Sequence, residues 1–226
     1  MMGTGTPRLG WNAGFSQCNT GGAVNDVDFT RAVALWMLEN LCVDPARLFA
    51  AGFSNGGSMT FNLTCTMSDV FAGFSFVGST QPPSTYPSEP TCGRDGEPIK
   101  PMLGLCGKLD GCGNTIQTWF NEFGRLSGCS GRAVESTMSA TSTCWKFSNC
   151  GKEKDEPLEY CMVDNLGHCW SGNDCCDSQC SNQDPGNLDF SKHILDFFSG
   201  VPRKALANNG TAMLRQLRQE VGAQSQ

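Results

Sequence analysis

The sequence predicts a single α/β domain whose mostly parallel sheet is covered by helices on both faces. Short apolar segments alternate with amphipathic ones along the chain, which is the pattern of parallel strands joined by crossover helices. The 226 residues are enough for one sizeable core, and 39% hydrophobic with 17% charged residues is typical of a globular protein. We expect residues 1–200 to form the domain and residues 201–226 to form a polar tail.

The individual elements follow from local patterns. Segments with apolar residues at helical spacing are predicted helices, at 26–41, 56–66, 116–126 and 189–198. Short apolar runs are predicted strands, at 48–51, 72–77, 100–107 and 158–163. Asn25 and Asp26 are both candidate caps of the first helix, Pro45 interrupts the chain after it, and Gly200 ends the last one.

Charge and hydropathy exclude two classes of partner. The net charge is −6 and the Lys and Arg residues form no cluster, which argues against nucleic-acid binding. No apolar run approaches the ~20 residues that cross a bilayer. We expect a monomer with neither a nucleic-acid nor a membrane partner.

Fourteen cysteines indicate disulfides and an oxidising compartment. The first residues, "MMGTGTPRLGWNAG", lack the apolar stretch of a secretory signal. Either an export signal lies upstream or the cysteines stay reduced in a cytosol, and we favour export. We therefore predict a secreted protein in which most cysteines are paired, including Cys42 with Cys65 and at least one bridge holding the loop after His168. The sequons at Asn62 and Asn209 predict glycosylation.

The segment Gly52-Phe53-Ser54-Asn55-Gly56 lies between a predicted strand and a predicted helix. This is the G-x-S-x-G arrangement, in which a serine occupies a sharp strand-to-helix turn. Side chains at Gly52 and Gly56 would collide where strand packs on helix. The helix N-terminus directs its dipole and free N–H groups toward the serine oxygen, so the Asn55 N–H is the expected first donor to an oxyanion. Ser54 is a candidate nucleophile, or a turn residue in a glycine-rich chain.

A serine nucleophile needs a base, and the chain has two histidines. His193 lies in the middle of a predicted helix, so we expect it on the helix surface. His168 lies in a glycine-flanked loop after the fourth predicted strand, at the sheet edge where α/β proteins assemble active sites. Asp110 follows the third strand in a similar loop and is the expected orienting carboxylate, with Asp164 as its rival.

Two metal sites are conceivable in the cysteine-rich segment. Zinc could use His168 together with Cys169, Cys175, Cys176 and Cys180. Their C-x5-C-C-x3-C spacing matches no recognised zinc site, so we favour disulfides. Calcium could use Asp174, Asp177 and Asp184, but the glycine and glutamate of an EF-hand loop are absent. We expect no metal and no cofactor.

Several motifs in order resemble one family. The runs "GWNAG", "VNDVDFTRAV", "CVDPARLFAAGFSNGGSMTFNLTC" and "FAGFSFVG" resemble the secreted feruloyl esterase and polyhydroxybutyrate depolymerase-like esterases of the α/β-hydrolase fold. Residues 106–110, "CGKLD", and 167–172, "GHCWSG", correspond to that family's H-G-T-x-D and G-H-x-W-P-G motifs, with Cys106 and Ser171 as departures. The resemblance covers about residues 10–200.

The resemblance implies Ser54 as nucleophile, His168 as base, Asp110 as the residue orienting it, and Trp170 at the acyl or sugar site. It implies a serine carboxylesterase that needs no cofactor and acts on plant cell-wall polysaccharide esters such as feruloylated xylan. A polyhydroxyalkanoate depolymerase with the same residues and an inactive secreted binding module are the alternatives.

The family's first strands and its H-G-x-G loop would precede Trp11. Ten residues cannot contain them, so the resemblance implies an N-terminally truncated α/β-hydrolase domain. We therefore expect one flank of the strand at 48–51 to be uncovered, because nothing in residues 1–23 reads as a strand.

Overall fold

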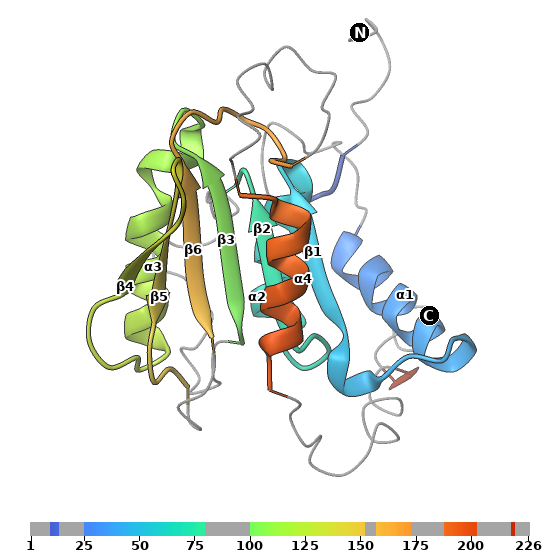
Figure 1. The fold of residues 1–226 in the computed structure, drawn as a ribbon. Coiled ribbons are helices and arrows are strands. Elements are labelled where there is room, and N and C mark those ends of the chain that lie inside the picture. Colours follow the sequence, from blue (N-terminus) through green and yellow to red (C-terminus); the bar gives the residue numbers. More distant parts are fainter. Residues whose placement is uncertain are drawn as a thin grey trace, which may run out of the picture.

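The computed structural model describes residues 10–13, 25–79, 100–151, 157–172, 188–202 and 218–219. Its centre is a six-stranded sheet with the strand order β1-β2-β3-β6-β5-β4 (Figure 1). The strands are β1 (Phe49–Phe53), β2 (Gly73–Val77), β3 (Met102–Gly107), β4 (Val134–Ser139), β5 (Ser142–Phe147) and β6 (Leu158–Val163). The helices are α1 (Asp26–Asn40), η1 (Pro45–Arg47), α2 (Asn55–Thr66), η2 (Gly111–Asn114), α3 (Ile116–Leu126) and α4 (Phe190–Gly200).

The sheet is mixed. Strands β1, β2, β3 and β6 pair in parallel, whereas β5 pairs antiparallel with both β6 and β4. The four parallel strands therefore end at one edge of the sheet, and the loops that follow β1, β3 and β6 meet there. These are the loops that carry Ser54, Asp110 and His168.

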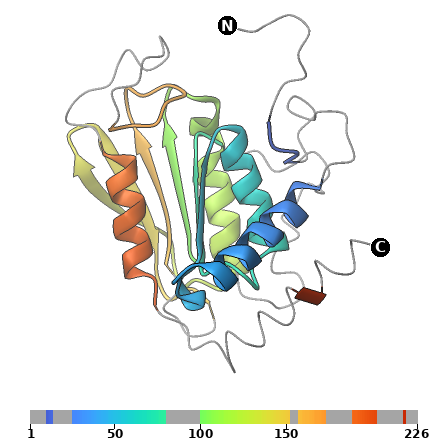
Figure 2. The same cartoon turned by 90° about the vertical axis from the view of Figure 1, so that its right-hand side faces the viewer.

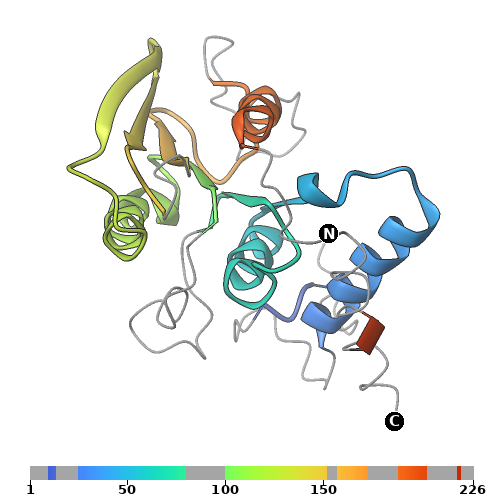
Figure 3. The ribbon, with the colours of Figure 1, turned by 90° about the horizontal axis from the view of Figure 1, so that it is seen from below.

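Helices cover both faces of the sheet, as the apolar pattern predicted. Helices α1, α2 and α3 lie on one face and α4 lies on the other (Figures 2 and 3). Alternation along β2 explains this arrangement, because Phe74 and Phe76 point into the core under α2 and α3, whereas Val77 points into the core under α4. The fold is therefore of the α/β class.

All four predicted helices are present within a few residues of their expected ends, and α3 matches its prediction. Asn25 caps α1, since its side chain accepts a hydrogen bond from the Asp28 N–H. The β4–β5 hairpin was not predicted, so the described residues form six strands instead of the expected four. Strand β4 is exposed along nearly its whole length and lacks the apolar pattern on which the strand predictions relied. Stacking of Trp145 on Tyr160, at 4.9 Å between ring centroids, fastens the hairpin to β6.

Strand β1 is the edge strand of the described sheet and pairs only with β2 there. Ala51, in the middle of β1, is exposed. This agrees with the expectation of an uncovered flank within the described residues. Residues 1–9 and 14–24 lie outside them, as does most of the predicted tail, so the truncation and the tail remain predictions.

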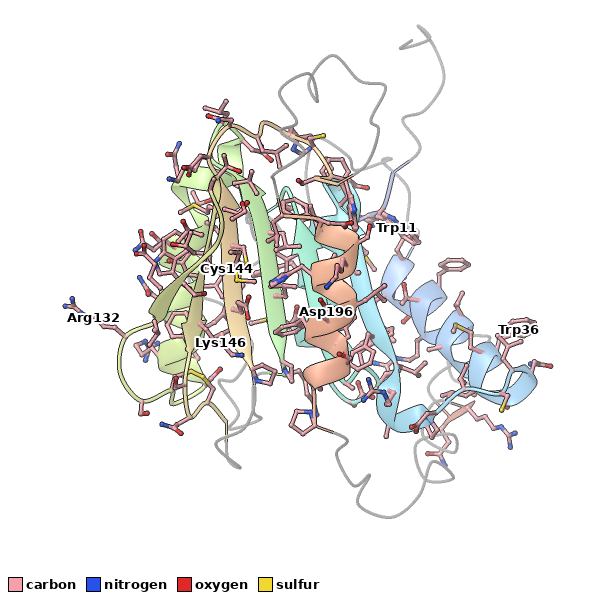
Figure 4. All side chains as sticks on the ribbon, in the orientation of Figure 1. Trp11, Trp36, Arg132, Cys144, Lys146 and Asp196 are labelled. Atoms are coloured by element: carbon pink, nitrogen blue, oxygen red, sulfur yellow. A yellow bond between two sulfur atoms is a disulfide. The ribbon has the colours of Figure 1, made fainter. Side chains whose placement is uncertain are left out.

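Eight of the nine described cysteines are in disulfides, as the composition predicted. Three bridges join Cys106 to Cys112, Cys129 to Cys150, and Cys144 to Cys161, the last connecting β5 with β6 (Figure 4). The prediction of a Cys42–Cys65 pair is wrong. Cys42 is an exposed free thiol just beyond α1, whereas Cys65 is in a disulfide.

Two other features bear on sequence predictions. No described helix combines the length and the apolar character that a membrane crossing requires. The sequon at Asn62 lies within α2, where Asn62 is half-buried and Thr64 is buried. The Asn209 sequon lies outside the described residues.

Candidate active site

Ser54 forms the sharp turn between β1 and α2. Its φ of 55° and ψ of −118° are unusual for a residue with a side chain and are the backbone conformation of a strained turn. The turn is held by a hydrogen bond from the Ser54 N–H to the Val77 carbonyl (2.9 Å) and by one from the Ser58 N–H to the Ser54 carbonyl (3.0 Å). The surrounding hydrogen bonds therefore hold this strained conformation in place.

Two glycines let β1 and α2 approach each other at the turn. A Cβ at Gly52 would lie 2.1 Å from the Gly56 carbonyl oxygen, so only glycine fits there, as predicted. The same prediction for Gly56 is wrong, because a Cβ there would meet only the Trp11 side chain, at 3.8 Å from Nε1 and 3.9 Å from Cδ1, which is ordinary van der Waals contact. The second crowded position is Gly57, whose Cβ would lie 2.9 Å from the Val77 carbonyl oxygen.

His168 lies between Ser54 and Asp110. Its Nε2 is 2.7 Å from Ser54 Oγ, and its Nδ1 is 2.8 Å from Asp110 Oδ2. The Asp110 side chain is 12% exposed and that of His168 is 35% exposed, so the carboxylate is shielded while the imidazole faces the outside. With a proton on Nδ1 donated to Asp110, Nε2 can accept the proton of Ser54.

The rival carboxylate, Asp164, has another partner. It lies four positions before His168 in sequence, but its side chain pairs with Lys108 at 2.6 Å. Asp110, 58 residues away from His168, makes the contact instead.

Aromatic rings surround the imidazole. Phe53 stacks on His168 with 4.8 Å between ring centroids, and the rings of Phe53 and Trp170 are nearly perpendicular, with 6.3 Å between their centroids. Trp170 donates a hydrogen bond from Nε1 to Ser191 Oγ of α4 (2.9 Å), which fixes its ring beside the site. Gly78, with φ of +62°, lies against both rings, since a Cβ there would be 2.9 Å from Phe53 Cε2 and 3.2 Å from His168 Nδ1.

The Asn55 side chain is engaged on the other side of the turn. Its Oδ1 accepts from the Trp11 N–H (2.6 Å) and its Nδ2 donates to the Trp11 carbonyl (3.1 Å). Trp11 therefore lies next to the N-terminus of α2 (Figure 4). Asn55 is the first residue of α2, and the N–H groups of a first helical turn have no carbonyl partner within the helix, so its N–H lies where an oxyanion donor is expected.

A groove of about 640 Å³ follows the free side of β1 and continues past Trp11. Phe53 and Asn55 line it, but Ser54 and His168 do not. The groove is therefore adjacent to the candidate site rather than part of it.

The other histidine is not a surface residue, so that prediction is wrong. His193 is 12% exposed and its Nε2 lies 2.8 Å from Glu159 Oε1, on the neighbouring strand β6. Cys161 Sγ lies 3.4 Å from the same nitrogen, but this sulfur is bridged to Cys144. The two cysteines of this cluster therefore offer no thiolate to a metal. The His193–Glu159 pair instead links α4 to the sheet from a largely buried position.

The loop after His168 begins with a bridged cysteine, as predicted. Cys169 is buried and in a disulfide, which removes it as a zinc ligand. The remaining zinc candidates and the three calcium candidates lie outside the described residues.

Sequence reasoning missed three contributors to the site: Phe53, Gly78 and Trp11. Each acts through contacts with residues far away in sequence, so no local pattern distinguishes them. One available signal was the position of Gly78 immediately after β2, because the ends of parallel strands meet at the same sheet edge.

No family model matches the chain. It is similar to Feruloyl esterase B of Piromyces equi, at 28% identity over 172 residues, which is 70% of this chain and 31% of that protein. It is also similar to Feruloyl esterase C of Emericella nidulans, at 42% identity over 68 residues (30% of this chain, 24% of that protein). Putative esterase NocK of Nocardia uniformis subsp. tsuyamanensis is 36% identical over 87 residues (35% and 25%). The chain thus resembles proteins named as esterases, while it spans less than a third of the length of each.

Proposed function

We propose that this protein is a serine carboxylesterase of α/β-hydrolase type in which Ser54, His168 and Asp110 form the catalytic triad. The observation that carries the proposal is the pair of short contacts that His168 makes, one with the strained serine and one with the shielded aspartate. Similarity to proteins named feruloyl esterase supports ester hydrolysis as the reaction.

In the proposed first step, Ser54 Oγ attacks the carbonyl carbon of the ester while its proton passes to His168 Nε2. These two atoms are 2.7 Å apart. Asp110 stabilises the resulting imidazolium through Nδ1. The oxyanion accepts a hydrogen bond from the Asn55 N–H at the positive end of α2.

Collapse of the tetrahedral intermediate breaks the ester C–O bond, and the imidazolium returns its proton to the departing alcohol. The acyl group is then held on Ser54. Water attacks this acyl-enzyme with His168 again as base, which releases the acid and restores the serine.

We infer that the substrate is an acylated plant cell-wall polysaccharide such as a feruloylated xylan, and that the protein is secreted. The names of the relatives support the first inference. The eight disulfide-bonded cysteines support the second, because disulfides persist in oxidising compartments. Phe53 and Trp170 would offer aromatic surface beside the nucleophile.

The test compares hydrolysis of p-nitrophenyl acetate, methyl ferulate and a hydroxybutyrate oligomer by the wild type and by Ser54→Ala. We expect methyl ferulate to be turned over and the variant to lose about 10⁶-fold in kcat while keeping its fold. Preference for the oligomer would indicate a polyhydroxyalkanoate depolymerase instead. Undiminished turnover by Ser54→Ala would remove the proposed nucleophile.

A further inference from the structure

A small disulfide ring encloses the carboxylate that contacts His168. Cys106 is the next-to-last residue of β3, Cys112 lies in η2, and their bridge spans Asp110. Both cysteines are buried, at 0% and 6% exposure. The other described bridges, Cys129–Cys150 and Cys144–Cys161, span longer segments without a candidate catalytic residue.

The disulfide contacts the same Asp110 oxygen that contacts His168. Asp110 Oδ2 lies 2.8 Å from His168 Nδ1, and Cys112 Sγ lies 3.3 Å from that same Oδ2. A disulfide sulfur carries no proton, so this is a packing contact rather than a hydrogen bond. It limits where the carboxylate oxygen can move.

The two halves of the ring are held differently. Before Asp110, the Lys108 N–H bonds the Val163 carbonyl (2.9 Å) and the Leu109 N–H bonds the Leu166 carbonyl (3.0 Å), which ties this half to β6 and the His168 loop. From Asp110 onward, the described backbone bonds are local, such as the one from the Asp110 N–H to the Gly107 carbonyl. Covalent attachment to Cys106 therefore anchors the second half.

We propose that the Cys106–Cys112 disulfide is a positioning element that holds Asp110 against His168. The catalytic consequence rests on the function proposed above, whereas the contact itself does not. Because the bridge restricts a glycine-containing ring, its removal allows Asp110 to sample positions out of reach of His168.

The kinetic test uses Cys106→Ala/Cys112→Ala, with Cys129→Ala/Cys150→Ala as the matched control. We expect the first variant to lose about 10- to 100-fold in kcat with KM changed less than about threefold, because the catalytic geometry is altered while substrate contacts remain. The control bridge follows α3, at the opposite edge of the sheet from Asp110, and joins residues 21 positions apart in sequence rather than six. Its loss should lower Tm more and kcat less. Equal losses of kcat in the two variants would overturn the proposal.

A second readout does not require catalysis. The His168 Nδ1 proton, when held in its bond with Asp110, should give a low-field resonance in the proton NMR spectrum. The chain has only two histidines, so His193→Gln assigns the signal. We expect the resonance to vanish in the Cys106→Ala/Cys112→Ala variant and to persist in the control. Its persistence in both would overturn the proposal, even if the wild type hydrolysed no ester.

A rescue variant separates positioning from folding. Asp110 has φ of −83° and ψ of 156°, the conformation that a following proline favours, and Gly111 begins η2 with open space around its Cβ position. Gly111→Pro in the chain lacking both cysteines should therefore restore kcat severalfold and return the resonance. It is also the chain to measure if the double variant alone fails to fold. A folded rescue variant that recovers neither kcat nor the low-field resonance counts against the proposal.

Discussion

Gly78→Ala tests whether the packing behind His168 sets the position of its imidazole against Ser54. The added Cβ would lie 2.9 Å from Phe53 Cε2 and 3.2 Å from both Cε1 and Nδ1 of His168. Ordinary carbon contacts are about 3.5 Å, so the two rings must yield by roughly 0.3–0.6 Å. The same imidazole makes the 2.7 Å contact between His168 Nε2 and Ser54 Oγ, so a shift of the ring changes this distance. Since a displacement of about 1 Å can cost ~10²-fold in rate, we expect about a tenfold loss in kcat.

Gly128→Ala is the matched control. Gly128 has the same φ of +62° but nothing within 4 Å of its Cβ position. Both alanine variants carry the same backbone strain of about 1–2 kcal/mol, which lowers Tm by roughly 2–4 °C per kcal/mol in a chain of this size. Only Gly78→Ala adds the collision with the rings. Kinetics on methyl ferulate and thermal unfolding should therefore separate the two. A Gly78→Ala protein with wild-type kcat would show that this packing does not position His168 for the proposed reaction.

Three further predictions follow. Asp110→Asn should lower kcat by about 10³- to 10⁴-fold, because the amide no longer holds the productive imidazole tautomer, whereas Asp164→Asn should lower kcat only slightly. If steady-state kinetics gave the reverse order, Asp164 would be the residue that orients His168. Among the described cysteines, only Cys42 should be alkylated in unreduced, denatured protein, as peptide mapping can establish; labelling of the bridged ones would point to a reduced protein. Burial, assisted by the Glu135 carboxylate, raises the pKa of Tyr160 from 10.0 to about 12. The folded state thus holds the phenol proton more tightly than the unfolded state does. The resulting contribution to the free energy of unfolding is present below pH 10 and is lost as pH rises toward 12. Denaturant unfolding should show a loss of roughly 1 kcal/mol between pH 9 and 11 that Tyr160→Phe lacks.

Helix α1 has large apolar side chains on its exposed side as well as a buried side that faces the domain. Phe29 and Trp36 are 55% and 56% exposed, and Trp36 points away from the sheet (Figure 4). Ala34 on the opposite side is buried, and Arg31 pairs with Asp69 at 3.0 Å. The helix is therefore held to the domain by one face, while its outward face leaves large apolar side chains in contact with solvent.

Local patterns were enough to locate the elements that carry the site. The helical spacing in residues 116–126 and the short apolar runs around 72–77 and 158–163 depend only on neighbours within one or two turns. The G-x-S-x-G segment likewise specified a strand, a turn and a helix from five residues. The exposed β4 was missed because its residues carry no apolar alternation, and pairing with β5 defines it.

Contacts between distant strands could not be predicted from local patterns. Proximity in sequence favoured Asp164 beside His168, yet Asp110 makes the contact, because β3 and β6 are adjacent and end at the same edge. The same adjacency of distant segments buries His193 against Glu159. Local sequence patterns show which residue types are available at the ends of the strands. Which of them meet depends on strand order and register, and these are set by the packing of the whole core rather than by any neighbouring residues.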